Sequence, residues 1–365
     1  MIAGHASPEG TARFAARFPL PGHFREVDGL RLSSVGLGTY LGGADAATDA
    51  LQHAAAASCL GGGVNVIDCA INYRNMRSER AVGAALQALV ASGAIARDEV
   101  FVATKGGFIP FDDRRPADPA EYVQRTVVES GLARADEVVA GCHCLAPRWI
   151  ESQIARSREN LGLETIDLYY LHNPETQLDE VSKAAFHDRM RGAFGVLEAA
   201  VAAGHIRRYG VATWDGLRTS PTGKGHVSLE SVFALARDAG GSAHHFRVVQ
   251  LPFSLAMPEA LTAQSQSVDG ESGPALLAAK ALGLHTMASA PLMQSKLTRG
   301  LPPLVREVFP GLTSDAQRAI QFARSAPALD VALVGMKRAE HVTEDLATCA
   351  VAPASQEQFM RLFGG

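Results

Sequence analysis

Short apolar runs alternate with helix-like segments along most of this chain, and this alternation is the strongest constraint on its fold. Each run is short and bounded by turn residues, as expected of a buried strand. We predict eight strands, at residues 35–39, 64–68, 100–104, 166–171, 209–213, 248–251, 285–289 and 332–335. Helices are predicted at 45–60, 78–91, 149–161, 184–203 and 339–346, with a weak one near 120–131. Eight strands separated by helices indicate an α/β fold, a (β/α)8 TIM barrel.

A doubly wound dinucleotide-binding sheet is the alternative α/β arrangement, and the sequence argues against it. That sheet needs a GxGxxG turn after its first strand, but Leu41 stands where the third glycine would follow Gly36 and Gly38. Upstream, Asp28-Gly29 joins two short alternating runs and predicts a β-hairpin over residues 24–33. We find no repeat or low-complexity linker, so one domain is predicted over 24–365, preceded by a surface extension at 1–23.

Charge and cysteine content exclude several classes of protein. The chain has 365 residues and a net charge of -4, so it lacks the basic surplus that neutralises nucleic-acid phosphates. No apolar run approaches the roughly 20 residues needed to cross a bilayer. Five cysteines without a secretory signal indicate reduced thiols and a cytoplasmic protein. The triplet 142–144 (Cys-His-Cys) lacks the ligand spacing of a zinc site, so no metal is expected.

Four polar side chains are predicted to stand at or just beyond the carboxyl ends of neighbouring strands. Asp68 ends one apolar run and Tyr73 follows it by five residues, while Lys105 and His172 end the next two runs. Barrel enzymes build their sites at this end of the strands, so the four would meet at one mouth.

Together these groups are suited to proton transfer. A lysine ammonium favours the phenolate of a nearby tyrosine, and an aspartate paired with the lysine keeps it charged. The phenol would then act as a general acid toward an oxygen that gains negative charge. Taken singly each has a structural explanation: Asp68 caps a loop, Lys105 is a solvated rim charge, Tyr73 packs at the core edge and His172 lies in a turn.

The chain resembles the aldo-keto reductases from residue 24 to residue 346. The matching segments are 35–39 (VGLGT), 66–68 with 72–73 (VID, NY), 103–105 (ATK), 160–163 (NLGL) and 167–172 (DLYYLH). The family's catalytic tetrad falls on Asp68, Tyr73, Lys105 and His172. The resemblance implies a barrel whose N-terminal end is closed by the hairpin, reversible hydride transfer between a nicotinamide cofactor and a carbonyl or alcohol, and Tyr73 as general acid.

The resemblance also implies where the nicotinamide would bind. Gly38 and Thr39 belong to the matched first segment, and Gln250 corresponds to the family's amide-binding glutamine. The usual Ser-Asn pair after the fifth strand is replaced by Ala212-Thr213, so one hydroxyl remains. Ser289 replaces the aromatic residue that often stacks on the ring. A weaker hold on the nicotinamide is therefore expected.

The last predicted strand leads into a segment similar to the family's adenosine-phosphate loop. Lys337 and Arg338 would pair with a 2′-phosphate at a helix N-terminus, which favours NADPH over NADH. The family's arginine and asparagine further along appear here as His341 and Asp345. The alternative is that the basic pair merely begins a solvated helix.

Substrate preference is expected to depend on the loops at the barrel mouth, above all the long segment 106–147. Trp214 and His143 are the candidate substrate contacts, with strand-end packing and a satisfied strand histidine as their alternatives. The leading hypothesis is an NADP-dependent reductase of an aldehyde, ketone or sugar-type alcohol. The alternative is a nucleotide-sensing regulatory subunit on the same barrel with little turnover. The oligomeric state and the substrate itself are left open.

Overall fold

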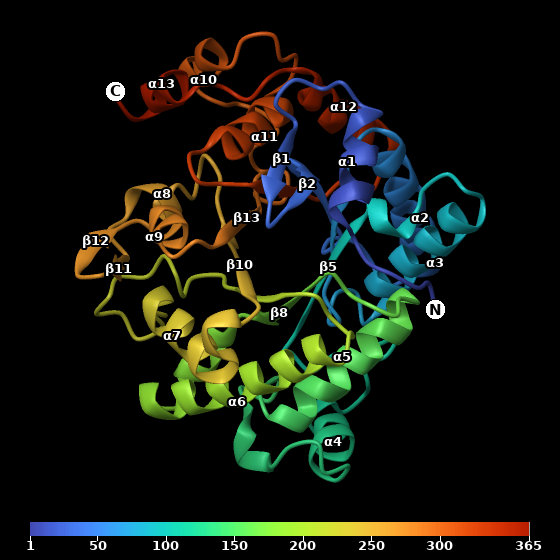
Figure 1. Ribbon diagram of the computed structural model, residues 1–365, viewed down its shortest axis with the longest axis vertical. Helices are drawn as coiled ribbons and strands as arrows, with labels where there is room; N and C mark the ends of the chain where they lie inside the picture. Colours follow the sequence, from blue (N-terminus) through green and yellow to red (C-terminus); the bar gives the residue numbers. More distant parts are fainter. Residues whose placement is uncertain (365) are drawn as a thin grey trace.

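The computed structural model describes residues 1–364 and shows eight parallel strands closed into a barrel with helices around it (Figure 1). Around the barrel the strands follow the order β10-β13-β14-β3-β4-β5-β8-β9. They are β3 (Val35–Gly38), β4 (Val66–Asp68), β5 (Phe101–Gly106), β8 (Leu168–His172), β9 (Tyr209–Ala212), β10 (Phe246–Pro252), β13 (His285–Ser289) and β14 (Val331–Val334). The predicted (β/α)8 barrel is confirmed, and each predicted strand overlaps an observed one.

The helices that follow these strands form the outer layer of the barrel. They are α2 (Ala46–Gly61), α3 (Arg77–Ala91), α5 (Pro147–Leu161), α6 (Lys183–Ala202), α7 (Leu229–Gly240), α9 (Ala275–Ala281), α11 (Asp315–Ser325) and α12 (Ala339–Ala347). Helices α7, α9 and α11 were not predicted from the sequence. Helix α11 carries a detectable signal, because Ser314 and Gln317 form a capping box at its start.

Shorter elements lie in the loops and near both ends of the chain. Three are hairpins: β1 (Phe24–Val27) with β2 (Leu30–Ser33), β6 (Val138–Val139) with β7 (His143–Cys144), and β11 (Gln266–Val268) with β12 (Glu271–Gly273). The short helices are α1 (Pro8–Ala16), α4 (Pro119–Val123), α8 (Glu259–Thr262), α10 (Pro303–Val308) and α13 (Gln356–Met360). Short 3-10 helices are η1 (Arg97–Glu99), η3 (Ala135–Glu137), η4 (Pro174–Asp179), η5 (Gly241–Ala243), η6 (Thr348–Ala350) and η7 (Arg361–Phe363), and η2 (Gln124–Val128) is a short π-helix.

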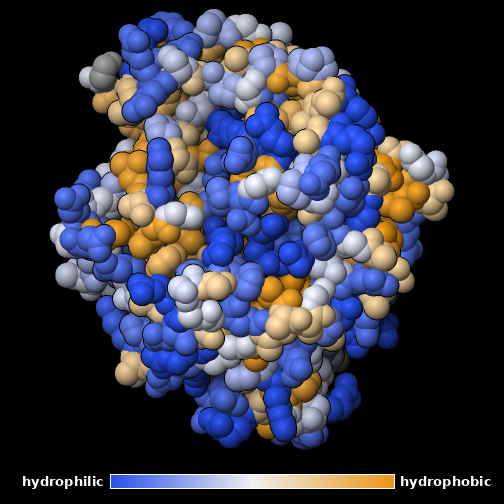
Figure 2. All heavy atoms as spheres, viewed as in Figure 1, coloured by the Kyte–Doolittle hydropathy of each residue, from blue (hydrophilic) through white to orange (hydrophobic). Residues whose placement is uncertain are grey.

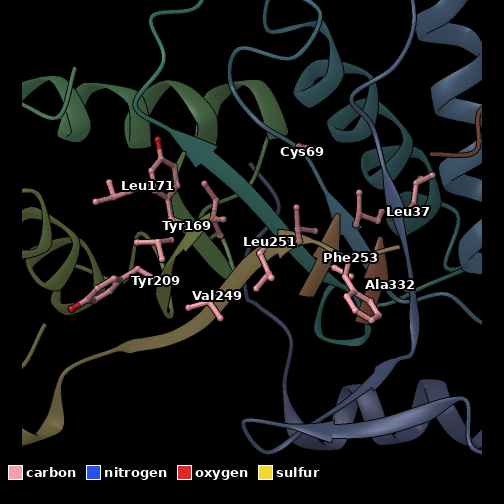
Figure 3. Close-up of a cluster of buried hydrophobic side chains, with 14 of the residues drawn as sticks. Leu37, Cys69, Tyr169, Leu171, Tyr209, Val249, Leu251, Phe253 and Ala332 are labelled. Carbon is pink, nitrogen blue, oxygen red and sulfur yellow. The ribbon is translucent and has the colours of Figure 1, made fainter. Parts of the chain in front are cut away.

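Alternate residues of the strands enter two separate cores, because successive side chains of a strand point to opposite faces. Val249, Leu251 and Phe253, in and just beyond β10, point outward into the layer between barrel and helices (Figure 3). The inner core contains Val248 and the hairpin residues Val27 and Leu32. The β1–β2 hairpin therefore closes one end of the barrel, as predicted.

The N-terminal residues pack against the rest of the molecule. Helix α1 is capped by the Ser7 side chain, and its Phe14 is fully buried. The backbone N–H of Ala6 donates to Asp167 Oδ1 at 2.6 Å. At Gly10 an added Cβ would lie 2.2 Å from the carbonyl oxygen of Asp98, so only glycine fits this contact. The division into an extension and one domain stays a prediction.

On the face shown in Figure 2, hydrophilic residues predominate and hydrophobic ones form several separate groups. No helix within residues 1–364 combines the length and apolar character needed to cross a membrane. All five cysteines are free thiols, and four of them are buried.

Candidate active site

A cavity of about 420 Å³ opens at the carboxyl ends of the barrel strands. Its wall is formed by strand ends and by the loops that follow them. The lining residues are Gly38, Thr39, Tyr40, Leu41, Asp68, Asn72, Tyr73, Phe108, His172, Asn173, Ala212, Thr213, Trp214, Gln250, Ser289, Ala290, Pro291, Leu292, Met293, Gln294, Ser295, Leu333 and Gly335. Three of the four predicted catalytic residues therefore lie in one wall, and the fourth, Lys105, is buried directly beneath them.

Lys105 is the centre of a buried cluster at the cavity floor. Its ammonium donates to Asp68 Oδ2 at 2.5 Å and to the carbonyl oxygen of Cys69 at 2.7 Å. It also lies 3.3 Å from the hydroxyl of Tyr73 and 4.7 Å from the centre of the Tyr73 ring. The side chain of Lys105 is fully buried, so the aspartate and the phenol replace water around its charge.

The charge states of this cluster follow from burial and pairing. Burial lowers the pKa of Lys105, but Asp68 and Tyr73 together outweigh it, and the pKa is raised above its ordinary value. Burial raises the pKa of Tyr73, and Lys105 opposes this rise without cancelling it. The predicted effect of Lys105 on the phenol therefore has the right sign but is smaller than the effect of burial. At pH 7 Lys105 is therefore a charged ammonium and Tyr73 a protonated phenol.

His172 ends β8 beside this cluster. Its ring meets the Tyr73 ring edge to face, with 5.7 Å between their centres. Burial and then the charge of Lys105 lower the pKa of His172 well below its ordinary value, so its imidazole is neutral at pH 7. A neutral imidazole at this point is suited to donate or accept one hydrogen bond in the cavity.

The loop after Tyr73 has an unusual backbone that Arg74 holds in place. Arg74, Asn75 and Met76 all have positive φ, from 52° to 68°, which is uncommon for residues other than glycine. The guanidinium of Arg74 is buried and binds Gly43 O, Gln52 Oε1 and Asp49 Oδ1. These bonds fix the turn that leaves Tyr73 facing the cavity.

The five residues predicted to contact the nicotinamide all line the cavity: Gly38, Thr39, Thr213, Gln250 and Ser289. Gln250 donates through Nε2 to Asp68 Oδ1 at 2.9 Å, which joins this group to the buried cluster around Lys105. Thr213 Oγ1 is buried and has no hydrogen-bond partner in the described part of the chain. Such a group calls for a ligand or a water molecule.

The four residues predicted to hold the adenosine phosphate lie outside this cavity, in and before α12. Lys337 is partly exposed, and Arg338 and His341 are exposed. Asp345 differs from them, because it is only 3% exposed. Burial raises its pKa to about 7. A side chain in this position faces the protein interior, so its predicted contact with a cofactor has no direct support in the geometry.

The two predicted substrate contacts have different outcomes. Trp214 lines the cavity and is 44% exposed. His143 does not reach the cavity, because its side chain is fully buried behind His172. The alternative interpretation of His143, a satisfied strand histidine, fits its position in β7. Phe108 from the same long segment does line the cavity.

Several lining residues were missed by the sequence analysis. Tyr40 and Leu41 directly follow the predicted contact Thr39, and Asn72 directly precedes Tyr73. Their adjacency in sequence to predicted site residues was the signal that could have identified them. The loop 290–295 was missed as well; Met293, Gln294 and Ser295 in it all have positive φ. No cluster of three or more potential metal ligands occurs among residues 1–364.

Comparison with known proteins agrees with this architecture. The family model described as "Aldo/keto reductase family" matches residues 34–220. A curated relative, D-threo-aldose 1-dehydrogenase from Pseudomonas sp, is 31% identical over 153 residues. That match covers 41% of this chain and 40% of the relative, so the chain spans about two fifths of that protein's length.

Solved structures share the fold across nearly the whole chain. An aldo/keto reductase from Klebsiella pneumoniae, in complex with NADP and acetate, has a TM-score of 0.63 and 20% identity, and the match covers 94% of each chain. The holo form of aldo-keto reductase AKR11C1 from Bacillus halodurans has a TM-score of 0.63 and 17% identity, covering 94% of this chain and 96% of its own. With the family match over more than half of its residues, the chain belongs to the aldo/keto reductase family.

Proposed function

We propose that this protein is an NADP(H)-dependent oxidoreductase that transfers hydride reversibly between the cofactor and an aldehyde, a ketone or a sugar-type alcohol. The observation that carries the proposal is the buried Lys105 ammonium, in contact with both Asp68 and Tyr73 at the cavity floor. A phenol held against a buried ammonium is suited to exchange a proton with an oxygen whose negative charge changes during reaction.

The residues of the cavity fit a nicotinamide. Thr213 Oγ1 lacks a partner within residues 1–364, and Gln250 keeps its Oε1 as an acceptor while Nε2 binds Asp68. The nicotinamide, when bound, supplies or accepts the hydride. Lys337 and Arg338 stand before α12 and would hold a 2′-phosphate, which favours NADPH over NADH. The Klebsiella relatives were solved with NADP and with NADPH.

In reduction, Tyr73 gives its proton to the carbonyl oxygen as that oxygen becomes negative. Lys105 stabilises the phenolate left behind, and Asp68 keeps Lys105 charged. The neutral imidazole of His172 orients the same oxygen through one hydrogen bond. In oxidation, the phenolate of Tyr73 takes the proton of the alcohol.

The cavity wall suits a hydroxylated substrate. Tyr40, Phe108 and Trp214 supply aromatic surface around the mouth. The buried Oδ1 of Asn72, next to Tyr73, has no hydrogen-bond partner within residues 1–364. An amide beside the reacting oxygen selects compounds with a second hydroxyl or carbonyl nearby. The match to an aldose dehydrogenase agrees with this choice.

The test begins with nicotinamide fluorescence during titration with NADPH and NADH, followed by steady-state assays with simple aldehydes and a panel of aldoses. We expect tight NADPH binding and multiple turnovers that the Tyr73→Phe variant loses while it keeps the cofactor. Cofactor binding without turnover would instead support the regulatory subunit. Absence of binding would reject both.

Free thiols throughout and the absence of a membrane-spanning helix within residues 1–364 support a cytoplasmic location.

A further inference from the structure

The long segment between β5 and α5 carries a buried histidine to the back of the candidate active site. This segment leaves the barrel at Gly107, forms α4 and the β6–β7 hairpin, and returns beside His172. His143, in β7, is fully buried. Its Nε2 lies 2.8 Å from the carbonyl oxygen of His172.

That carbonyl would otherwise be left without a partner from the barrel. The peptide between His172 and Asn173 donates its N–H to Ala212 O, on β9, at 2.6 Å. Its C=O therefore points the other way, toward β5. Strand β5 has already ended there, because its last residue, Gly106, pairs with Leu171. His143 thus supplies the hydrogen bond that a longer β5 would have made.

The proton positions on His143 follow from its partners at both ends. A carbonyl only accepts, so Nε2 must carry the hydrogen that bonds to His172. At the other end, Arg189 Nη1 donates to Gln177 Oε1 at 2.5 Å. A guanidinium only donates, so the opposite side of Gln177 is its NH2 group, which donates to His143 Nδ1 at 2.7 Å. Both ends therefore require the neutral tautomer with hydrogen on Nε2.

The packing and charge around His143 agree with this assignment. An added Cβ on Gly107 would lie 2.9 Å from His143 Nε2 and 3.2 Å from the His172 oxygen, so the chain passes over this bond where only glycine fits. Burial lowers the pKa of His143 to about 4, which keeps the ring neutral. On the outer side, Arg189 also binds the backbone of Asp136 and Glu137, and so joins the network to the long segment.

We infer that His143 is a positioning residue for the catalytic histidine: its Nε2–H, oriented by Gln177 and Arg189, fixes the backbone from which the His172 ring enters the cavity. The inference rests on the proposed function, because it assigns His172 to the reacting oxygen. It also gives the long segment a role apart from substrate contact. His143 acts through His172 and touches no ligand itself.

Two variants distinguish the hydrogen bond to the His172 carbonyl from the hydrogen bond to Gln177. In His143→Gln the longer amide reaches about as far as Nε2 and keeps a donor for the His172 carbonyl. In His143→Asn the shorter amide stays near Gln177, so the His172 carbonyl has no hydrogen-bond donor from this position. Histidine side-chain ¹H–¹⁵N correlation spectra of the wild type read the tautomer directly, and the signal missing from His143→Asn identifies His143. Thermal unfolding compares the stability of the two variants.

We expect the Nε2–H tautomer between about pH 6 and pH 9. We also expect a fall in kcat of roughly tenfold or more in His143→Asn. KM and NADPH affinity should stay within about twofold, and His143→Gln should recover most of kcat. Equal kcat in two equally stable variants, or a hydrogen on Nδ1, would overturn the inference. If the wild type itself never turns over, the proposed function fails, and the role in positioning falls with it. If the wild type turns over and both variants keep its kcat, the positioning role alone is rejected.

Discussion

Replacing Asp345 by asparagine is expected to stabilise the protein, and to do so only above acidic pH. The carboxylate of Asp345 is 3% exposed and makes no hydrogen bond or ion pair within residues 1–364. Burial, followed by the neighbouring Glu344, raises its pKa from 3.8 to about 7. The folded protein therefore holds this proton over a range in which the unfolded chain has already lost it.

The sign and size of the effect follow from the linkage between proton binding and folding stability. Because the folded pKa is the higher one, the contribution of Asp345 to stability is complete below about pH 4 and is lost as the pH rises to about 7. Each pH unit corresponds to about 1.4 kcal/mol, so a difference of about three units gives a loss of about 4 kcal/mol. An asparagine amide has nearly the same shape and does not ionise, so Asp345→Asn avoids this loss.

Urea unfolding at about pH 5 and pH 8 measures the difference in free energy of unfolding between variant and wild type. We expect this difference to be about 3 kcal/mol larger at the higher pH. Glu340→Gln is the matched control, because Glu340 lies on the same helix with its side chain 68% exposed, and it should show no such change. A difference for Asp345→Asn that does not vary with pH would refute the reasoning.

The remaining predictions concern the site and the helix packing. Tyr73→Phe should lower kcat by about 10²- to 10⁴-fold with NADPH affinity unchanged, as measured by steady-state kinetics and fluorescence titration. Replacing Lys337 and Arg338 together by methionine should weaken NADPH binding about tenfold or more and leave NADH binding unaltered. Gly83→Ala should destabilise by roughly 1–3 kcal/mol in urea unfolding, because its Cβ would lie 2.7 Å from carbonyl oxygens of α5. Gly195→Ala, in open space on α6, should stabilise by roughly 0.5–1 kcal/mol, and a cost there would show that helix propensity does not decide the result.

The sequence was sufficient to predict the barrel because its strands are buried on both faces. Such strands appear as short apolar runs, and the polar residues that end them stand out. Asp68, Lys105 and His172 were identifiable for that reason, and the structure places Asp68 and His172 in the cavity wall with Lys105 buried against Asp68. Helices α7 and α9, which lie between predicted strands, were not predicted.

What the sequence did not predict depends on contacts between distant segments. His143 was expected near substrate because it belongs to a long mouth segment, but whether a side chain faces the cavity or the core depends on register. The pairing of Val139 with His143 turns the ring away from the cavity and toward Gln177. Likewise, the buried position of Asp345 depends on which face of α12 packs against the neighbouring helices α2 and α11.

The coupling between the proposed acid, Tyr73, and the residues predicted to bind the cofactor is visible only in three dimensions. Asp68 uses Oδ2 for Lys105 and Oδ1 for Gln250, so one carboxylate fixes both the charge beside Tyr73 and the orientation of the amide predicted to meet the nicotinamide. Removing that carboxylate would leave a fully buried ammonium without its counter-charge, which favours loss of its proton. The phenol would then lose the partner that stabilises its ionised form. Proton transfer and cofactor orientation are therefore expected to fail together when Asp68 is changed, although the two functions lie on different strands.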